Sequence, residues 1–237
     1  MSDTDAFGRV VLNLADAVEN GGPIDPVASR ITPANQDDAE ELAGAVLAQL
    51  GFAPCGVRLV PAADGSLIAG PMLEARFLDD GAGISLEIMR HGRASAALLG
   101  VLGAALEPEA TTPPDIIAIH PALDVSASRF TQGPADRFAE IADLAGLGLL
   151  VLGKRRPMPE GPSRVALVEG DGRSQGKPCD LHAAFAQAAT EARRLGGLPA
   201  GAVLVVAGLG APVLGLKAGA RLTARFTGIG KVSARFG

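Results

Sequence analysis

The sequence predicts an α+β fold in which a mixed β-sheet is accompanied by a few separate helices. Short strand-like apolar runs recur through the middle and the end of the chain, and helical patterns lie mainly near its start. The C-terminal residues form the clearest element. Apolar and polar residues alternate over Arg221–Phe226 and Lys231–Phe236, and a turn with two glycines, Thr227–Gly230, joins them. This pattern is typical of a β-hairpin.

Several segments show the spacing of helices. The predicted helices span 4–19, the segment that Asn35 caps, 92–105, 134–141 and 181–195. Asn35 precedes acidic residues, and Asp180 precedes the last of these helices, so each is placed to cap a helix N-terminus. We therefore expect a small helical N-terminal lobe over residues 1–52, followed by a sheet-rich domain over 53–237, the two forming one compact unit.

Strands are expected where short apolar runs are bounded by turn residues. Besides the terminal hairpin, they are predicted at Val57–Val60, Met72–Leu78, Ile84–Met89, Ile116–Val125, Leu149–Leu152 and Arg164–Val168.

The composition excludes several classes of function. The net charge of −5 argues against nucleic-acid binding, which relies on a basic surface, and the absence of Trp and Tyr argues against base stacking. No apolar run is long enough to span a membrane, and the first residues lack the basic start of a signal peptide. We expect a cytoplasmic protein.

Two segments carry a resemblance to a known family. Residues 119–130 read IHPALDVSASRF, and the chain ends in GIGKVSARFG. Both are similar to segments of the fumarylacetoacetate hydrolase superfamily, of the types HPALEVVDSRF and GLG-VSVRF, in the branch of 2-keto-4-pentenoate hydratases and 4-oxalocrotonate decarboxylases. The resemblance runs from about Asn35 to the C-terminus. It implies a domain with mixed sheets of the β-roll type and an oligomer, either of this chain alone or with a second protein subunit.

The resemblance also implies one Mg²⁺ or Mn²⁺ ion held by three carboxylates. Two belong to a Glu-x-Glu on one strand, where alternate side chains share a face, and the third is the Glu of PALEV. The matching residues here are Glu74 and Arg76 for the pair, and Asp124 for the third. Arg76 puts a positive charge where a carboxylate is expected, which opposes binding of a cation.

Further positions that the resemblance assigns to the site are changed in this chain. Arg58 stands at the Lys of a G-x-K-x-G segment, and Leu144 and Leu147 replace polar residues, whereas His120 and Ser128 are retained. His120 is a catalytic candidate or a hydrogen-bonded structural residue. Arg58 and Arg76 are suited to holding a carboxylate through paired hydrogen bonds. The alternative is that Arg76 neutralises Glu74 or Asp124 in a site that has lost its function.

Three functions remain open at this point. The resemblance favours a hydratase- or decarboxylase-like lyase that acts on or binds a small 2-oxo carboxylic acid, without the metal if the arginines replace it. A non-catalytic relative would serve as a binding module or partner subunit. The third alternative is a different reaction in the same pocket, where Leu144 and Leu147 favour a less polar ligand.

Overall fold

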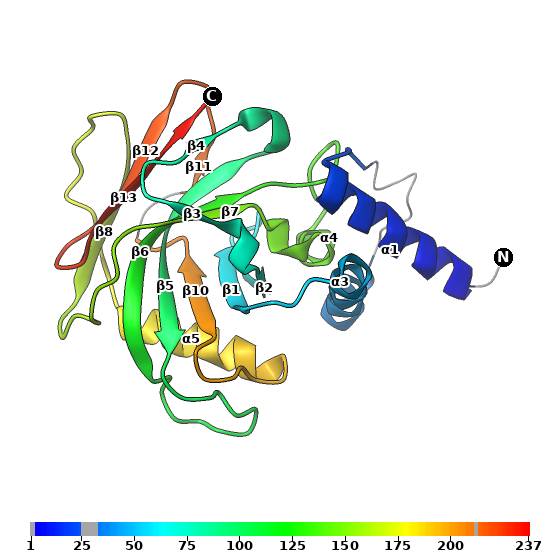
Figure 1. The fold of residues 1–237 in the computed structure, drawn as a ribbon, viewed down its shortest axis with the longest axis horizontal. Coiled ribbons are helices and arrows are strands. Elements are labelled where there is room, and N and C mark those ends of the chain that lie inside the picture. Colours follow the sequence, from blue (N-terminus) through cyan, green and yellow to red (C-terminus); the bar gives the residue numbers. More distant parts are fainter. Residues whose placement is uncertain (1–2, 25–32, 211–212) are drawn as a thin grey trace.

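The computed structural model describes residues 3–24, 33–210 and 213–237, and it consists of two mixed sheets with helices around them (Figure 1). The large sheet has the order β2-β1-β10-β5-β6-β7-β3, and β11 also pairs with β5. The small sheet has the order β4-β13-β12-β8-β9. The predicted α+β class with mixed sheets is therefore confirmed.

The elements have the following bounds. The strands are β1 (Gly56–Pro61), β2 (Leu67–Met72), β3 (Phe77–Asp79), β4 (Gly83–Ile84), β5 (Arg93–Leu102), β6 (Ile116–Ser126), β7 (Leu149–Leu152), β8 (Ser163–Glu169), β9 (Lys177–Cys179), β10 (Val203–Ala207), β11 (Leu214–Gly215), β12 (Arg221–Phe226) and β13 (Gly230–Phe236). The helices are α1 (Asp3–Asn20), α3 (Gln36–Leu50), α4 (Arg137–Ala142) and α5 (Leu181–Arg194), with short 3-10 turns η1 (Glu74–Arg76), η2 (Leu86–Ile88) and η3 (Leu144–Gly146).

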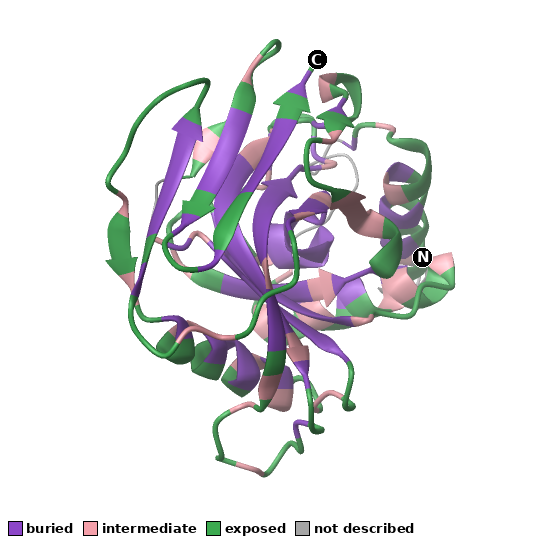
Figure 2. Cartoon of the chain, turned by 60° about the vertical axis from the view of Figure 1, so that its left-hand side comes forward, coloured by how far each residue is buried: buried purple, intermediate pink, exposed green. Residues whose placement is uncertain are grey.

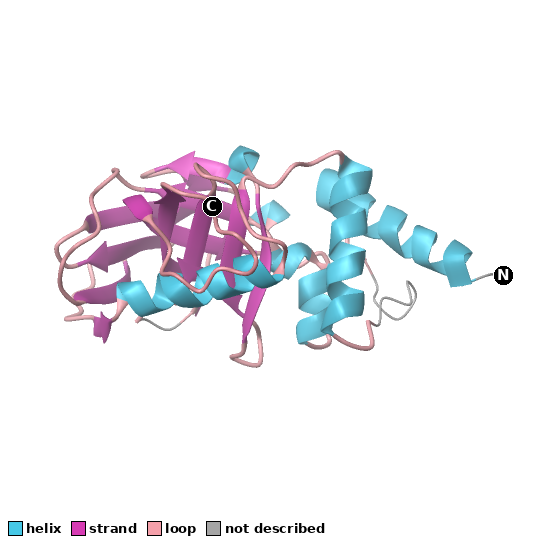
Figure 3. Cartoon of the chain, turned by 90° about the horizontal axis from the view of Figure 1, so that it is seen from below, coloured by secondary structure: helices cyan, strands magenta, loops and turns pink. Residues whose placement is uncertain are grey.

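The two faces of the large sheet are covered by different elements. Its strands alternate their side chains between one core shared with the small sheet and α5, and another shared with α1, α3 and α4. Figure 3 shows α1, α3 and α4 gathered at one end of the molecule, while α5 runs along the sheets. The strands are buried where the layers meet (Figure 2). The candidate site lies on the face that carries α4.

The capped helices form as predicted. The side chain of Asn35 accepts a hydrogen bond from the Asp38 N–H, and that of Asp180 accepts one from the Ala183 N–H. The helix predicted from Pro134 begins later, at Arg137, after an Asp136 cap. The terminal hairpin is also confirmed, because β12 and β13 pair antiparallel. The division into units at residue 52 remains a prediction, and part of its first unit, residues 25–32, lies outside the described residues.

Three predicted elements are wrong, and the errors affect the site. Residues 92–105 do not form a helix but the central strand β5, whose residues from Ala94 to Gly100 are all buried. A strand that is covered on both faces shows no alternation of polar and apolar residues, so its run of Ala and Leu looked helical. The predicted strand over 72–78 is interrupted by η1, and the one over 84–89 contains only the last residue of β4, followed by η2.

No helix in the described part of the chain has the length and apolar character needed to cross a membrane.

Candidate functional site

An arginine and an aspartate form a buried ion pair on the face of the large sheet that carries α4. Arg58 Nε lies 2.5 Å from Asp124 Oδ1, and Arg58 Nη2 lies 3.0 Å from Oδ2. Nη1 donates to the Ala145 carbonyl at 2.8 Å, and Nη2 also donates to Ser126 Oγ at 2.7 Å. Arg58 is only 1% exposed and Asp124 only 2%. With every nitrogen of the guanidinium bonded, the pair is satisfied internally.

The neighbouring strand β5 completes this face. In the antiparallel pairing of β5 and β6, Ser95 lies opposite Asp124 and Arg93 lies opposite Ser126. Ala97, two residues further along β5, lies opposite Ala122 on the same face. Two ligands at i and i+2 beside Asp124 would therefore come from position 95 and from either position 93 or position 97. The hydroxyl of Ser95 accepts a hydrogen bond from the Gly208 N–H at 3.1 Å. Glu74 and Arg76, the residues matched to the Glu-x-Glu pattern in the sequence, lie on the turn η1 and not on a strand.

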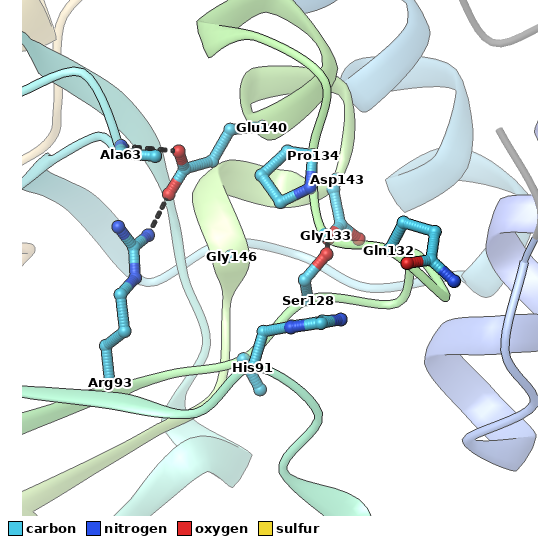
Figure 4. A pocket seen from close by; sticks show the side chains of 11 residues that line it. Ala63, His91, Arg93, Ser128, Gln132, Gly133, Pro134, Glu140, Asp143 and Gly146 are labelled. Atoms are coloured by element: carbon cyan, nitrogen blue, oxygen red, sulfur yellow. Dashed lines mark hydrogen bonds and ion pairs between the residues drawn. The ribbon is translucent and has the colours of Figure 1, made fainter. Parts of the chain in front are cut away.

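A cavity of about 240 Å³, which we call the polar pocket, is lined by residues of β5, α4 and η3 and by the loops next to them (Figure 4). Its charged lining comes from Arg93, Glu140 and Asp143, and its lining also includes His91 and Gly146. Glu140, which is 2% exposed, pairs with Arg93 and accepts a hydrogen bond from the Ala63 N–H at 3.0 Å. Arg93 neutralises Glu140 inside the pocket, and Asp143 is neutralised by Arg129, which lies outside its lining.

Asp143 forms a third buried ion pair behind the polar pocket. Its Oδ1 lies 2.5 Å from Arg129 Nε, and its Oδ2 accepts from the Arg129 N–H at 3.0 Å and from Ser128 Oγ at 3.2 Å. Burial raises the pKa of Asp143, and the contacts with Arg129 act in the opposite direction. Arg129 also donates to the Leu147 carbonyl at 2.6 Å. Arg129 is therefore fixed by its bonds to Asp143 and to the Leu147 carbonyl.

A second cavity, of about 210 Å³, lies between the end of α1 and the turns η1 and η2. We call it the arginine pocket, because Arg76, Arg90 and Arg129 line it. Arg76 is half-buried, and no hydrogen bond or ion pair to its guanidinium occurs within the described ranges. Burial lowers the pKa of Arg76, and the nearby charge of Arg129 lowers it further. One carboxylate, Glu19, also lines this cavity.

The remaining predicted site residues are dispersed. Glu74 is exposed on η1, where its charge acts on the Cys55 thiol, so it is not part of the Asp124 cluster. His120 Nδ1 lies 2.9 Å from the Gly153 carbonyl oxygen, which supports the structural interpretation of this residue. Ser128 lines both pockets.

Leu144 and Leu147 differ from each other in their surroundings. Leu144 is fully buried in the core, so it fills space and does not face an open cavity. Leu147 is also buried but contributes to the lining of the arginine pocket. Leu144 and Ala145 have φ of 55° and 52°, a left-handed conformation that costs L-residues about 1–2 kcal/mol each. This turn aims the Ala145 carbonyl at Arg58.

Comparison with solved structures shows the fold. 4-Oxalocrotonate decarboxylase from Pseudomonas putida G7, complexed with calcium and acetate or with magnesium and adipate, matches with a TM-score of 0.76 and 17% identity over 100% of this chain and 98% of that chain. Fumarylpyruvate hydrolase from Pseudomonas aeruginosa, in complex with Mn²⁺ and pyruvate, matches with a TM-score of 0.57 and 12% identity over 76% of this chain and 88% of that chain. The chain has the fold of the fumarylacetoacetate hydrolase superfamily, as the sequence resemblance predicted. No protein-family model matches the sequence, and no curated protein is similar to it in sequence.

The residues around Asp124 do not fit the divalent cations of these relatives. Both oxygens of Asp124 are bonded to Arg58. The nearest positions of β5 on the same face, 93, 95 and 97, hold an arginine, a serine and an alanine, so none of them offers a carboxylate. Within the described residues, no three His, Cys, Asp or Glu side chains gather closely enough to hold a metal ion. A cation here would have to displace a buried guanidinium and then remain beside it, which is electrostatically unfavourable.

Proposed function

We propose that this protein binds a small carboxylic acid in the arginine pocket without a divalent metal ion. The observation that carries the proposal is Arg76, a half-buried guanidinium that has no partner within the described residues and lines a cavity with Arg129. A charged group that has lost part of its hydration gains most from an anion that supplies paired hydrogen bonds. A carboxylate at Arg76 would also offset the repulsion from Arg129.

The rest of the lining suits a small organic acid rather than a bare inorganic anion. Val18, Ile88, Met89 and Leu147 give the cavity apolar surface next to the arginines. Pockets for small ligands combine such apolar surface with a few polar groups that fix the orientation of the ligand. The comparisons support this class of ligand, because the related structures contain acetate, adipate or pyruvate.

Calorimetric titration of oxalate, with and without Mn²⁺, tests the proposal. Wild-type protein stripped of metal should bind oxalate, and Mn²⁺ should neither bind by itself nor strengthen the binding. Arg76→Met should weaken binding at least about tenfold, which corresponds to the 1.4 kcal/mol of one charge-assisted contact. Arg225→Met removes an exposed arginine from β12 outside the pocket lining and serves as the matched control. Binding that requires Mn²⁺, or that survives Arg76→Met, would contradict the proposal.

A lyase reaction on a 2-oxo acid is the second candidate function, and the polar pocket favours it. Glu140, Asp143 and His91 line that cavity together, and carboxyl and imidazole groups are the usual carriers of protons in catalysis. The test is turnover of 2-oxo acids by wild type and by a His91→Gln variant. Loss of turnover in the variant would support catalysis. Absence of turnover with retained oxalate binding favours the non-catalytic binding module or partner subunit, alone or in a homo-oligomer.

A further inference from the structure

The lining of the arginine pocket is electrically divided. Arg76, Arg90 and Arg129 supply positive charge. On the other side, the last turn of α1, residues 17–20, supplies backbone carbonyls and the carboxylate of Glu19. The last carbonyls of a helix have no donor within the helix, and together they carry a partial negative charge. The last turn of α1 contains no basic residue that would neutralise it.

Most of these acceptors remain available for a ligand. The Ala17 carbonyl accepts a hydrogen bond from the Gly21 N–H at 3.0 Å. For the carbonyls of the next three residues, Val18 to Asn20, the described part of the chain provides no such donor. Glu19 is exposed and likewise forms no ion pair within the described residues. A ligand held by its carboxylate at the arginines therefore meets oxygen acceptors on the α1 side of the cavity.

We propose that the acid bound here carries a hydrogen-bond donor beside its carboxylate, as a 2-amino or 2-hydroxy acid does, and that Glu19 and the end of α1 select for that donor. This inference rests on the proposed function. An ammonium group is attracted to the Glu19 carboxylate and to the helix end, and a hydroxyl group donates to either. A 2-oxo group has only acceptor lone pairs and would face other acceptors without a proton between them.

The three-carbon acids alanine, lactate and pyruvate form a matched series, since they share the carboxylate and the methyl group and differ at the 2-position. We expect alanine and lactate to bind wild-type protein at least about tenfold more tightly than pyruvate, in calorimetry at neutral pH without metal. A tenfold difference corresponds to the value of one hydrogen bond to a charged group.

Two variants separate this inference from the proposed function. Glu19→Gln removes the negative charge and keeps the size of the side chain, so alanine should lose at least about threefold in affinity while pyruvate stays the same or gains. Arg76→Met should weaken the binding of all three acids. Equal binding of the three acids, lost in Arg76→Met, would overturn the preference for a donor and leave the proposed function intact. Oxalate carries a second carboxylate in place of a donor, so we expect it, like pyruvate, to bind more weakly than alanine. If neither oxalate nor any of the three acids binds, both proposals fail.

Discussion

Arg58 and Arg76 were both predicted to hold a substrate carboxylate, yet the structure gives them opposite surroundings. Arg58 is 1% exposed and shares its nitrogens among Asp124, Ser126 and the Ala145 carbonyl. Arg76 is half-buried in the lining of a cavity and has no partner among the described residues. The partners of an arginine, rather than its place in a sequence pattern, therefore distinguish a structural role from a ligand-binding one.

Breaking the Arg58–Asp124 pair should have the largest effect on stability. Arg58→Met leaves the Asp124 carboxylate buried without its counter-charge, and we expect a loss of about 3–5 kcal/mol in the free energy of unfolding. Urea denaturation measures this loss. The double variant Arg58→Met/Asp124→Leu should recover much of it, because an apolar pair avoids the cost of a buried charge. A single variant as stable as wild type would show that the pair is not buried as described.

The close packing next to this pair gives the second prediction. A Cβ at Gly70 would lie 2.5 Å from Ala145 Cβ and 3.0 Å from the Leu144 carbonyl oxygen. We expect Gly70→Ala to cost about 1–3 kcal/mol through overpacking. The double variant Gly70→Ala/Ala145→Gly should regain part of this cost, since glycine also suits the positive φ of residue 145. Gly83→Ala, where a Cβ meets no atom within 4 Å, is the control and should be nearly neutral.

The contrasting prediction concerns the stability of Arg76 variants. Because no described partner loses a bond, Arg76→Met should leave the free energy of unfolding unchanged or raise it by up to about 1 kcal/mol. Urea denaturation alongside Arg58→Met makes the comparison direct. A loss as large as that of Arg58→Met would mean that Arg76 is structural, and it would remove the basis for the arginine pocket as a binding site.

The smallest expected effect on stability comes from an ion pair at the surface. Nη2 of Arg194, on α5, lies 2.5 Å from Oε1 of Glu40, on α3. Burial acts to raise the pKa of Glu40, but hydrogen bonds from Arg194 and Gln36 outweigh it and hold the pKa below its ordinary value.

A lowered carboxyl pKa stabilises the fold above the pKa of the unfolded chain, and this contribution is lost as the pH falls through the folded-state value. Arg194→Ala should therefore cost about 0.2–1 kcal/mol at pH 7 and almost nothing in strong acid. Thermal unfolding at both pH values checks this. A cost that persists in acid would show that Arg194 acts through packing.

The elements that could be predicted are those whose environment produces a pattern in neighbouring residues of the sequence. The β12–β13 hairpin has a polar face, and the caps Asn35 and Asp180 act within three residues. β5 shows no such local pattern, because it is buried on both faces. Its assignment as a helix therefore concealed that Ser95 lies opposite Asp124. The residues beside Asp124 could therefore not be predicted, because they lie on a strand that local sequence patterns do not identify.

The candidate site was predictable only in part for a related reason. The resemblance named Arg58 and Asp124 separately, but their contact joins residues that are 66 positions apart in the chain. Glu140 and Asp143 received no role, since an acidic residue near a short helix usually faces solvent, whereas here both are buried by the sheet. In the sequence, Leu144 was identified as an apolar residue at a position that is polar in the family, and the structure shows that it packs in the core.

The parallel pairing of β1 with β10 also decides when this chain can fold. Gly56 pairs with Val203 and Leu59 with Val206, so the large sheet cannot be completed until the chain has been synthesised beyond residue 206. Until then, β1 and β5 each lack the neighbour that lies between them. Contacts this distant in sequence slow folding and leave apolar strand edges open to aggregation. A nascent chain that stops before residue 203 contains the edge strands β2 and β3 of the large sheet but lacks β10, which joins β1 to β5.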